Sequence, residues 1–255
     1  MGSEVLMPAL TIVVPTFNEE GNVSDLVKKI VSALCIFEMN VRILFVDDSL
    51  PADAHGHSLT VLAIQRAAAL YTTLNGRFSV EVIHRKGPDR VGSLSGAVAR
   101  GFHETDSELV AVMDGDGQHP PIVLRAMIET FLDRDVDIVI ASRYTNGGDP
   151  GGLDGGLRRF VSKASTWLAK GLFPRRLCDV SDPMTGYFMV RRDVLRCDAL
   201  NPQGFKILLE VLVTHKLRIF EVPMRFEDRL SGESKASSSQ GKTYLRQLLQ
   251  LRFGI

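Results

Sequence analysis

The sequence predicts an α/β domain built on a mainly parallel, doubly wound sheet. Five short apolar runs, typical of buried strands, occur at residues 10–14, 41–46, 80–84, 109–113 and 137–141. The first four are followed by stretches with helical periodicity, at 22–37, 59–74, 93–103 and 121–133. Strands that alternate with helices at this spacing form parallel sheets, and 255 residues with a hydrophobic share of 45% can bury a sizeable core.

The second half of the chain continues this pattern less regularly. A glycine-rich loop at 144–156 precedes helical periodicity at 157–172, and a turn near residue 182 leads into an expected strand that ends near residue 190. A helix at 204–214, a strand at 217–222 and a helix at 244–251 are expected to follow. The apolar stripe of the helix at 157–172 has basic flanks, so this helix is expected to face either the core or a membrane surface.

Charge is distributed unevenly along the chain, although the net charge is zero. Residues 1–155 carry 12 Lys and Arg against 21 Asp and Glu, whereas residues 156–255 carry 18 against 9. An acidic half that holds a metal ion and a basic half that faces an anion is one interpretation, and ordinary solvated surface is the other. Zero net charge and few aromatic residues near the basic ones argue against a nucleic-acid-binding role.

The cysteines and the apolar segments indicate in which cellular compartment the protein is expected. Three cysteines, an odd number without metal-ligand spacing, favour a reducing environment over a disulfide framework. No signal peptide is visible at residues 1–8, and no stretch reaches the roughly twenty apolar residues that cross a bilayer. A cytoplasmic location is therefore expected, and a continuation of the natural chain past Ile255 is left open.

The main chemical signal lies directly after the apolar run at 109–113. Asp114 and Asp116 follow this run, and in open α/β sheets ligands bind beyond the carboxyl ends of the strands. Their spacing lets both carboxylates, with Gln118 behind them, approach one hard cation that also keeps waters and phosphate oxygens. A plain polar turn is the alternative, whereas an EF-hand is excluded because its glycine and glutamate positions are not matched. His119 is expected to support the ligands rather than to bind the metal.

A second pair of carboxylates, Asp47 and Asp48, follows the run at 41–46. Because parallel strands share one carboxyl edge, a nucleotide could lie with its base near Asp48 and its phosphates near Asp114 and Asp116. The loop at 87–93 is not a P-loop, because it lacks the lysine that reaches the phosphates. The first strand is not followed by G-x-G-x-x-G, which argues against a dinucleotide site.

Six motifs occur in the order that is found in inverting A-type glycosyltransferases. They are Val14-Pro15-Thr16-Phe17-Asn18-Glu19, Val46-Asp47-Asp48-Ser49, Asp114-Gly115-Asp116-Gly117-Gln118-His119-Pro120, Ala141-Ser142-Arg143-Tyr144, Asp182-Pro183-Met184-Thr185-Gly186-Tyr187-Phe188 and Gly232-Glu233-Ser234-Lys235. Over about residues 10–240 the chain resembles the polyprenol-phosphate (dolichol-phosphate) mannose synthases of family 2, bacterial type. This resemblance implies the A-type glycosyltransferase fold, with nucleotide and metal at the carboxyl edge of the sheet.

The resemblance also implies a reaction and its partners. The donor would be GDP-mannose, the acceptor a polyprenyl (dolichyl-type) phosphate, the product polyprenyl-phosphate mannose and the cofactor Mg²⁺ or Mn²⁺. The enzyme would be peripheral on the inner face of the membrane, at its cytosolic surface. Residues 1–240 would form the catalytic domain and residues 241–255 an amphipathic C-terminal helix, with a following membrane segment left open.

Residue roles follow from the positions of these motifs. The nucleotide would contact Pro15, Phe17, Glu19, Asp48, Asp114 and Lys235, with Phe17 in place of the family's usual tyrosine. The metal would be bound by Asp114, Asp116 and Gln118. The acceptor phosphate would be bound by Arg143, Arg158 and Ser162, with Arg159 as the alternative to Arg158 because helix phase is uncertain by one residue. Catalytic roles would fall to Asp116, Arg143 and Arg229, and Asp182 is expected to order its own turn.

The residues fit this chemistry. An isoprenoid monophosphate is already an anionic nucleophile near neutral pH, so no strong general base is needed. The reaction needs positioning instead, and it needs charge stabilisation on the departing diphosphate by a divalent ion and Arg229. Two alternatives stay open: a UDP-glucose (or other UDP-sugar) transferase that uses the same lipid phosphate, and an inactive nucleotide-sugar-binding protein.

Overall fold

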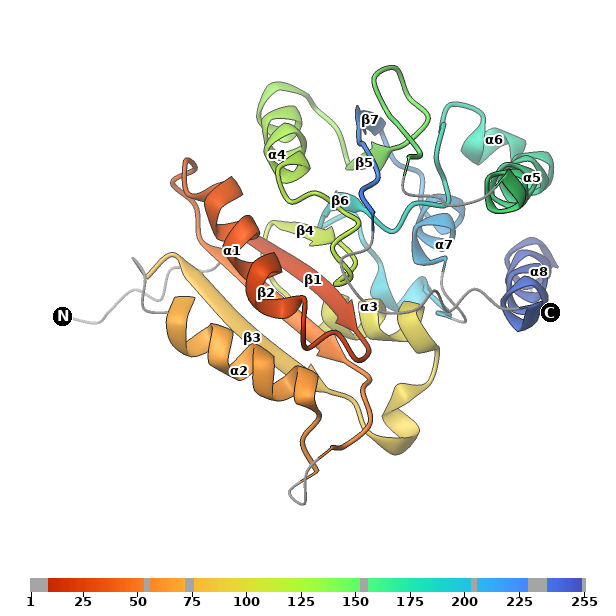
Figure 1. Cartoon of the computed structure of the whole chain (residues 1–255). Coiled ribbons are helices and arrows are strands. Elements are labelled where there is room, and N and C mark those ends of the chain that lie inside the picture. Colours follow the sequence, from red (N-terminus) through yellow and green to blue (C-terminus); the bar gives the residue numbers. More distant parts are fainter. Residues whose placement is uncertain are drawn as a thin grey trace.

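A seven-stranded sheet forms the centre of the protein (Figure 1). The computed structural model describes residues 9–52, 56–71, 76–151, 156–202, 206–228 and 238–253, and of residues 156–163 and 238–240 it describes the backbone alone. The strands are β1 (Leu10–Thr16), β2 (Val41–Asp47), β3 (Phe78–His84), β4 (Leu109–Val112), β5 (Ile138–Ser142), β6 (Phe188–Arg191) and β7 (Ile219–Pro223). The inner strands are buried along nearly their whole length, which explains their continuous apolar sequences.

The order of the strands is β3-β2-β1-β4-β6-β5-β7. From β1 the chain first builds outward through β2 to β3, and it then returns to place β4 on the other side of β1. The strands β1 and β4 therefore flank a topological switch point, and in open α/β sheets ligands bind beyond the carboxyl ends of the strands at such a point. Every strand pair is parallel except those of β6, which confirms the predicted mainly parallel, doubly wound sheet.

Strand β6 runs antiparallel between β4 and β5. Its amino end consequently lies at the edge where its neighbours have their carboxyl ends. The turn at residues 181–187, which leads into β6, therefore reaches the same edge as the loops that follow β4 and β5. The sequence predicted a strand here without its direction, because the apolar pattern of a short buried strand is the same in either direction.

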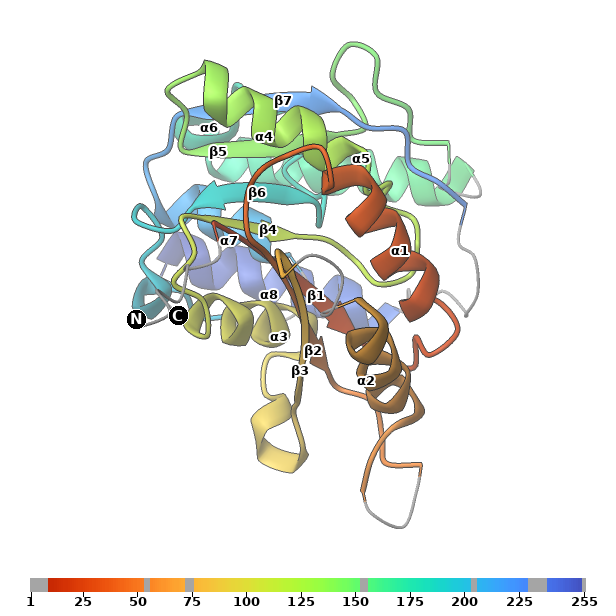
Figure 2. The same cartoon turned by 90° about the vertical axis from the view of Figure 1, so that its left-hand side faces the viewer.

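Helices cover both faces of the sheet (Figures 1 and 2). One face packs against α1 (Val23–Leu34), α2 (Leu59–Tyr71) and α4 (Val123–Asp133). The other face packs against α3 (Ser93–His103), α5 (Gly156–Leu172), α6 (Pro174–Leu177), α7 (Ile207–Thr214) and α8 (Ser238–Phe253). Within the described parts of the chain, no helix combines the length and the apolar character that crossing a bilayer requires.

Helix α8 is attached to its layer by apolar and polar contacts. Tyr244 and Leu248 are buried in the core. The hydroxyl of Tyr244 donates to the Ser165 carbonyl of α5 at 2.7 Å, and Nε2 of Gln247 donates to the Lys206 carbonyl at 3.2 Å. One face of α8 is thus fixed to α5 and to the start of α7.

Most predicted elements agree with the structure within a few residues, and local causes explain the differences. Helix α4 begins at Val123 rather than at 121, because Pro120 and Pro121 form the turn before it. Helix α8 begins at Ser238 rather than at Tyr244, because the apolar residues that indicate the helix occur only in the turns that pack against the core. The sequence pattern did not predict α6, which is four residues long.

Helix α3 crosses β1 at a glycine, and this close approach can be tested. A Cβ on Gly101 would lie 2.4 Å from Cγ1 of the fully buried Val13. We therefore expect Gly101→Ala to lower the free energy of unfolding by about 1–3 kcal/mol, because a close-packed core must shift to admit the methyl group. Urea unfolding followed by circular dichroism measures the change.

Gly171→Ala is the matched control. Gly171 also lies in a helix, but an added Cβ would have nothing within 4 Å. This variant is expected to keep its stability or to gain up to about 1 kcal/mol from the better helix propensity of alanine. Equal losses in the two variants would contradict the close packing of α3 on β1.

Candidate active site

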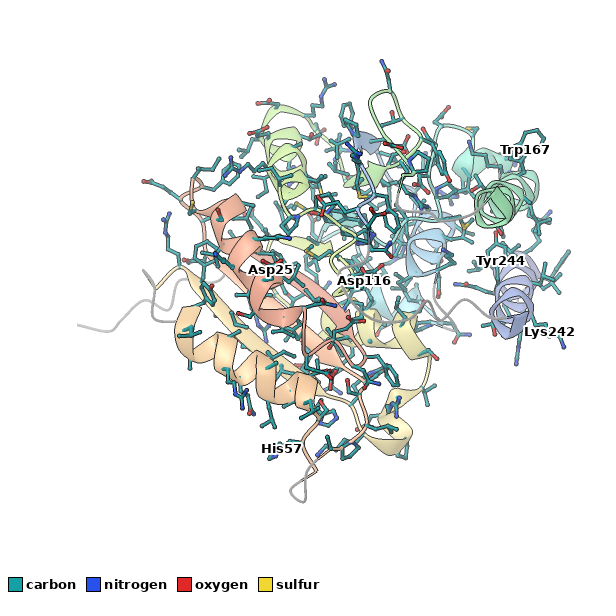
Figure 3. The ribbon with its side chains drawn as sticks, viewed as in Figure 1. Asp25, His57, Asp116, Trp167, Lys242 and Tyr244 are labelled. Carbon is teal, nitrogen blue, oxygen red and sulfur yellow. The ribbon has the colours of Figure 1, made fainter. Side chains whose placement is uncertain are left out.

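The loops after β1, β2, β4 and β5 carry most of the predicted site residues. Backbone hydrogen bonds extend the pairing past the strand ends: the Asp48 amide donates to the Thr16 carbonyl at 2.9 Å, and the Met113 amide donates to the Val13 carbonyl at 3.2 Å. Asp116 lies at this edge, near the middle of the molecule (Figure 3). The carboxyl edge of the sheet at the β1–β4 switch point is therefore the candidate active site.

Asp114 and Asp116 occupy the loop that follows β4. The side chain of Asp114 is 32% exposed, whereas Asp116 is nearly buried. The Gln118 amide donates to Oδ1 of Asp116 at 3.1 Å, which closes a turn around that carboxylate. Nε2 of Gln118 donates to the Glu227 carbonyl at 3.2 Å, and the Glu227 amide donates back to the Gln118 carbonyl at 3.0 Å. These bonds connect the loop to the segment after β7.

His119 supports this loop from behind. Its Nδ1 accepts a hydrogen bond from the Asp114 amide at 2.9 Å, so the proton of the neutral ring lies on Nε2, which is 3.7 Å from Oδ2 of Asp114. The buried ring stacks on Tyr187 with 4.9 Å between centroids. The Tyr187 hydroxyl donates to the Pro120 carbonyl at 3.1 Å, and burial raises the pKa of Tyr187 well above its usual value. His119 thereby positions Asp114.

The donor atoms at this loop suit a hard divalent cation. Asp114 and Asp116 supply two carboxylates, and the described residues contain no group of three or more His, Cys, Asp or Glu side chains that could hold a metal by themselves. Mg²⁺ binds in this way, through one or two carboxylates with waters and substrate phosphates as the other ligands, and Mn²⁺ prefers the same oxygen donors. The residues present thus fit Mg²⁺ or Mn²⁺ better than a four-ligand zinc site.

A buried ion pair joins the end of β5 to the turn at 181–187. Nε and Nη2 of Arg143 donate to the two carboxylate oxygens of Asp182 at 2.7 and 2.9 Å, and the Arg143 amide donates to the same carboxylate at 3.1 Å. The Arg143 side chain is 8% exposed and Asp182 is fully buried. Burial by itself lowers the pKa of Arg143, but the hydrogen bonds and the charge of Asp182 raise it by more. The pKa therefore lies above its usual value, and the guanidinium stays charged. Asp182 therefore does more than order its own turn, because it positions Arg143.

Two more contacts hold this turn at the site. Glu221 of β7 accepts hydrogen bonds from the Ser181 amide at 2.9 Å and from the Asp182 amide at 3.1 Å, and also from the Ser181 hydroxyl. Gly186 lies against the Asp114 carboxylate, since a Cβ on this glycine would be 3.3 Å from Oδ1. The turn therefore fixes Arg143 on one side and limits the space around Asp114 on the other.

Asp48 is clamped by an arginine that sequence reasoning did not single out. Arg85 follows β3, and its Nε and Nη2 donate to the two oxygens of Asp48 at 2.8 and 2.6 Å. Its guanidinium also donates to the carbonyls of Asp89, Val91 and Ser93 at 3.0, 3.1 and 2.8 Å. A carboxylate has about four lone-pair directions, so this clamp orients Asp48 and still leaves acceptor capacity for a ligand.

Asp47, the neighbour of Asp48, connects the surrounding loops. It is fully buried and accepts hydrogen bonds from the hydroxyls of Thr16, Ser49 and Ser58 at 3.0, 2.7 and 2.8 Å. Because these hydroxyls come from the end of β1, the loop after β2 and the start of α2, the base of the candidate nucleotide site is rigid.

The end of β1 and the loop after it carry Pro15, Phe17 and Glu19. Pro15 is buried in β1, whereas Phe17 is partly exposed with the guanidinium of Arg90 at 5.5 Å from its ring centroid. Oε2 of Glu19 accepts a hydrogen bond from Asn22 at 2.7 Å. Arg90 lies in the loop that Arg85 holds, so that loop approaches the predicted nucleoside-binding residues.

For four predicted site residues the structure describes no side chain. Arg229 and Lys235 lie outside the described residues, and Arg158 and Ser162 lie in the part of α5 of which the backbone alone is described. Pro15 lies in β1, one residue before the strand ends. The remaining predicted residues follow the strand ends at the carboxyl edge of the sheet: Phe17, Glu19, Asp48, Asp114, Asp116, Gln118 and Arg143.

This geometry can be compared with known proteins. The family model "Glycosyl transferase family 2" matches residues 11–198, which is more than half of the chain. The chain belongs to glycosyl transferase family 2. The matched span contains the loops after β1, β2, β4 and β5, and therefore the whole described carboxyl edge from Pro15 to the turn at 181–187.

Three curated relatives of this family 2 glycosyl transferase have the same printed name, dolichol-phosphate mannosyltransferase. The relative from Pyrococcus furiosus is 34% identical over 243 residues, which are 95% of this chain and 63% of the relative. Those from Mycosarcoma maydis and Saccharomyces cerevisiae are 33% and 30% identical, and the matches cover 97% and 94% of this chain and 81% and 86% of the relatives. The chain thus spans less than two thirds of the archaeal relative. These matches confirm the resemblance that the motifs indicated.

Solved structures of glucosyl-3-phosphoglycerate synthase from Mycobacterium tuberculosis are similar in fold. The complex with Mn²⁺, UDP and glucosyl-3-phosphoglycerate has a TM-score of 0.65 at 18% identity and covers 97% of this chain and 81% of that one. The complex with Mg²⁺ and UDP has a TM-score of 0.63 at 17% identity and covers 97% and 80%. These likenesses confirm the predicted A-type glycosyltransferase fold.

Sequence reasoning missed Arg85, Glu221 and Lys206. Lys206 precedes α7, and its Nζ donates to the Met184 carbonyl in the turn at 181–187 at 3.0 Å. The position of Arg85 directly after a predicted strand was a usable signal, because β3 neighbours the strand that presents Asp48. Glu221 and Lys206 had no local signal, since their partners lie far away in the sequence.

The buried ion pair predicts a large effect of charge removal. Asp182→Asn leaves the buried guanidinium of Arg143 without its counter-charge and should lower the free energy of unfolding by about 3 kcal/mol or more. Chemical unfolding at neutral pH and moderate salt measures the loss.

Asp135→Asn is the control for an exposed pair. Asp135 forms an ion pair with Arg218, but its side chain is 80% exposed, so its loss should cost no more than about 1 kcal/mol. If both variants lost the same small amount, Asp182 would not be the counter-charge that holds Arg143.

Proposed function

We propose that this glycosyl transferase transfers mannose from GDP-mannose to a polyprenyl phosphate of the dolichyl type, with inversion at the sugar carbon. The observation that carries the proposal is that the turn at 181–187 holds the buried cation Arg143 beside the carboxylate Asp114. The printed names of three relatives support this choice of substrates.

The reaction requires placement more than proton transfer. An oxygen of the acceptor phosphate attacks the anomeric carbon of mannose, and the bond from that carbon to the diphosphate breaks, with its electron pair going to GDP. The acceptor is already ionised near neutral pH, so no residue has to remove a proton. Attack on the side opposite the leaving group accounts for inversion.

Different parts of the site would bind the two substrates. Asp48, Pro15, Phe17 and Glu19 would hold the nucleoside, on the rigid base that Asp47 and Arg85 provide. Asp114, Asp116 and Gln118 would hold Mg²⁺ or Mn²⁺, which stabilises negative charge on a departing diphosphate. Because Nε and Nη2 of Arg143 donate to Asp182, an acceptor phosphate would contact the remaining N–H groups, on Nη1 and Nη2.

The remaining predicted residues keep the roles that their motifs imply. Arg143 would bind the acceptor phosphate, and the same role is proposed for Arg158 and Ser162. Arg229 and Lys235 would close over the diphosphate, and Lys235 would contact the nucleotide. We also propose that Asp116, Arg143 and Arg229 carry the catalytic roles.

An exposed surface on α5 and α8 suits a lipid-bound acceptor. The α5–α8 patch consists of exposed large apolar side chains, namely Trp167, Leu168, Leu245, Leu249 and Phe253. Exposed basic residues of α8 accompany it, at Lys242, Arg246 and Arg252. Trp167 and Lys242 point away from the sheet at the same side of the molecule (Figure 3). Apolar groups with basic neighbours favour a membrane surface with anionic lipids.

This patch supports the proposed location, and a domain division is proposed alongside it. The enzyme would act as a peripheral protein at the cytosolic face of the membrane. Residues 1–240 would form the catalytic domain, and residues 241–255 would serve as an amphipathic attachment helix.

The experiment that tests the function offers labelled GDP-mannose and UDP-glucose, side by side, to a polyprenyl phosphate in detergent. We expect labelled lipid from GDP-mannose alone, and only with Mg²⁺ or Mn²⁺. Asp116→Asn should reduce this transfer on the order of 100-fold or more, because the carboxylate that helps to hold the metal is lost. Asp135→Asn removes an exposed carboxylate just before β5, at the opposite edge of the sheet, and should have no effect on transfer.

Each other outcome has a defined meaning. Product from UDP-glucose alone would replace the sugar and the nucleotide in the proposal. Nucleotide binding without transfer from any donor would indicate an inactive binding protein. Full activity of Asp116→Asn would contradict the metal assignment.

The α5–α8 patch predicts binding to lipid vesicles. Replacing Leu245 and Leu249 together by serine should reduce sedimentation with anionic vesicles by about tenfold or more, because burying each leucine is worth roughly 1.5–3 kcal/mol. The control is Ile36→Ser with Leu132→Ser, two exposed residues outside the patch. Equal sedimentation of both variants and the wild type would exclude the patch as the attachment surface.

A further inference from the structure

We propose that Lys206 binds a phosphate oxygen of the reacting substrates, as a second cation beside Arg143. The inference rests on the proposed function, because it concerns the same site. The ligand chemistry is a phosphate oxygen, which either the acceptor monophosphate or the donor diphosphate can supply.

The fold brings Lys206 to the turn that organises the site. Its Nζ donates to the Met184 carbonyl at 3.0 Å, two residues from Asp182, which holds Arg143. Lys206 interacts electrostatically with Arg143, Asp182 and Asp114. The ammonium group is thus near both the proposed acceptor-phosphate arginine and the proposed metal ligand.

The local charges favour an anion at this place. Lys206 brings a second positive charge near Arg143, whose own charge is paired with Asp182. Burial and then repulsion from Arg143 lower the pKa of Lys206 to about 8. A phosphate oxygen between the two cations would remove this repulsion, and it would supply a charged hydrogen-bond acceptor.

The backbone at Lys206 is also held in place. Gln247 of α8 donates to the Lys206 carbonyl at 3.2 Å, and Tyr244, one turn earlier on α8, donates to α5 at 2.7 Å (Figure 3). With its Nζ bonded to the Met184 carbonyl as well, the lysine side chain loses less conformational entropy on binding than a lysine on an open surface.

The test distinguishes the effect of the Lys206 charge from the effect of its packing in the turn. Lys206→Gln removes the charge but keeps a donor for the Met184 carbonyl, and Lys206→Arg keeps the charge. The control Lys216→Met removes an exposed lysine that follows α7. KM and kcat are measured for GDP-mannose and polyprenyl phosphate, and calorimetry measures the binding of polyprenyl phosphate and of GDP with Mg²⁺. The thermal midpoint of each variant is recorded.

We expect Lys206→Gln to raise KM and Kd for one substrate by about tenfold or more, as the loss of a charged hydrogen bond does, while Lys206→Arg and the control stay within about threefold. A selective rise for polyprenyl phosphate identifies the acceptor as the source, and a rise for GDP-mannose and GDP identifies the diphosphate.

Unchanged KM and Kd for both substrates in Lys206→Gln would overturn the inference. A drop in the thermal midpoint that Lys206→Arg shares, without a selective change in binding, would overturn it as well, since Lys206 would then only hold the turn. Failure of the wild type to transfer mannose would refute the proposed function, whereas the binding measurements would still decide the role of Lys206.

Discussion

The geometry of the site depends on one buried ion pair, between Arg143 and Asp182. A guanidinium withdrawn from water must keep its counter-charge, since an unpaired buried charge costs several kcal/mol. The end of β5 and the turn at 181–187 therefore have to be fixed together. Glu221 holds the turn from β7, and Gly186 of the same turn lies against Asp114. Through this turn, the positions of the cationic group and of the proposed metal ligand are set by a single piece of backbone.

The two sides of the site are built in different ways. On the side of β1 and β2, carboxylates hold the loops together. Asp47 accepts hydrogen bonds from three hydroxyl groups, and Asp48 is bound by the guanidinium of Arg85. On the side of β5 and β6, the central group is a cation, and a backbone turn supports it. The first side therefore offers the Asp48 carboxylate, an acceptor that suits the hydroxyl and amine groups of a nucleoside, and the second offers the Arg143 cation, which suits a phosphate.

The sequence predicted what depends on local pattern. The alternation of strands and helices gave the sheet, and the position of Asp48 and Asp114 after apolar runs placed both residues at its carboxyl edge. Two kinds of feature could not be predicted from the sequence. The direction of β6 depends on which strands it joins, and the pattern at 182–190 does not encode this. The partners of Arg143 and Arg85 come from other loops, and each pairing exists only because the strand order brings these loops together.

The antiparallel insertion of β6 also affects the order in which the protein can assemble. Strands β1, β2 and β3 pair with their neighbours along the chain, whereas the β4–β6 and β5–β7 pairs join distant segments. Closing long segments costs more chain entropy and slows folding. While the polypeptide leaves the ribosome, the nucleotide side can form from residues already made, but Arg143 lacks its counter-charge until the turn at 181–187 emerges. The proposed acceptor side is therefore expected to mature after the proposed nucleotide side, once the turn at 181–187 and α8 have been made.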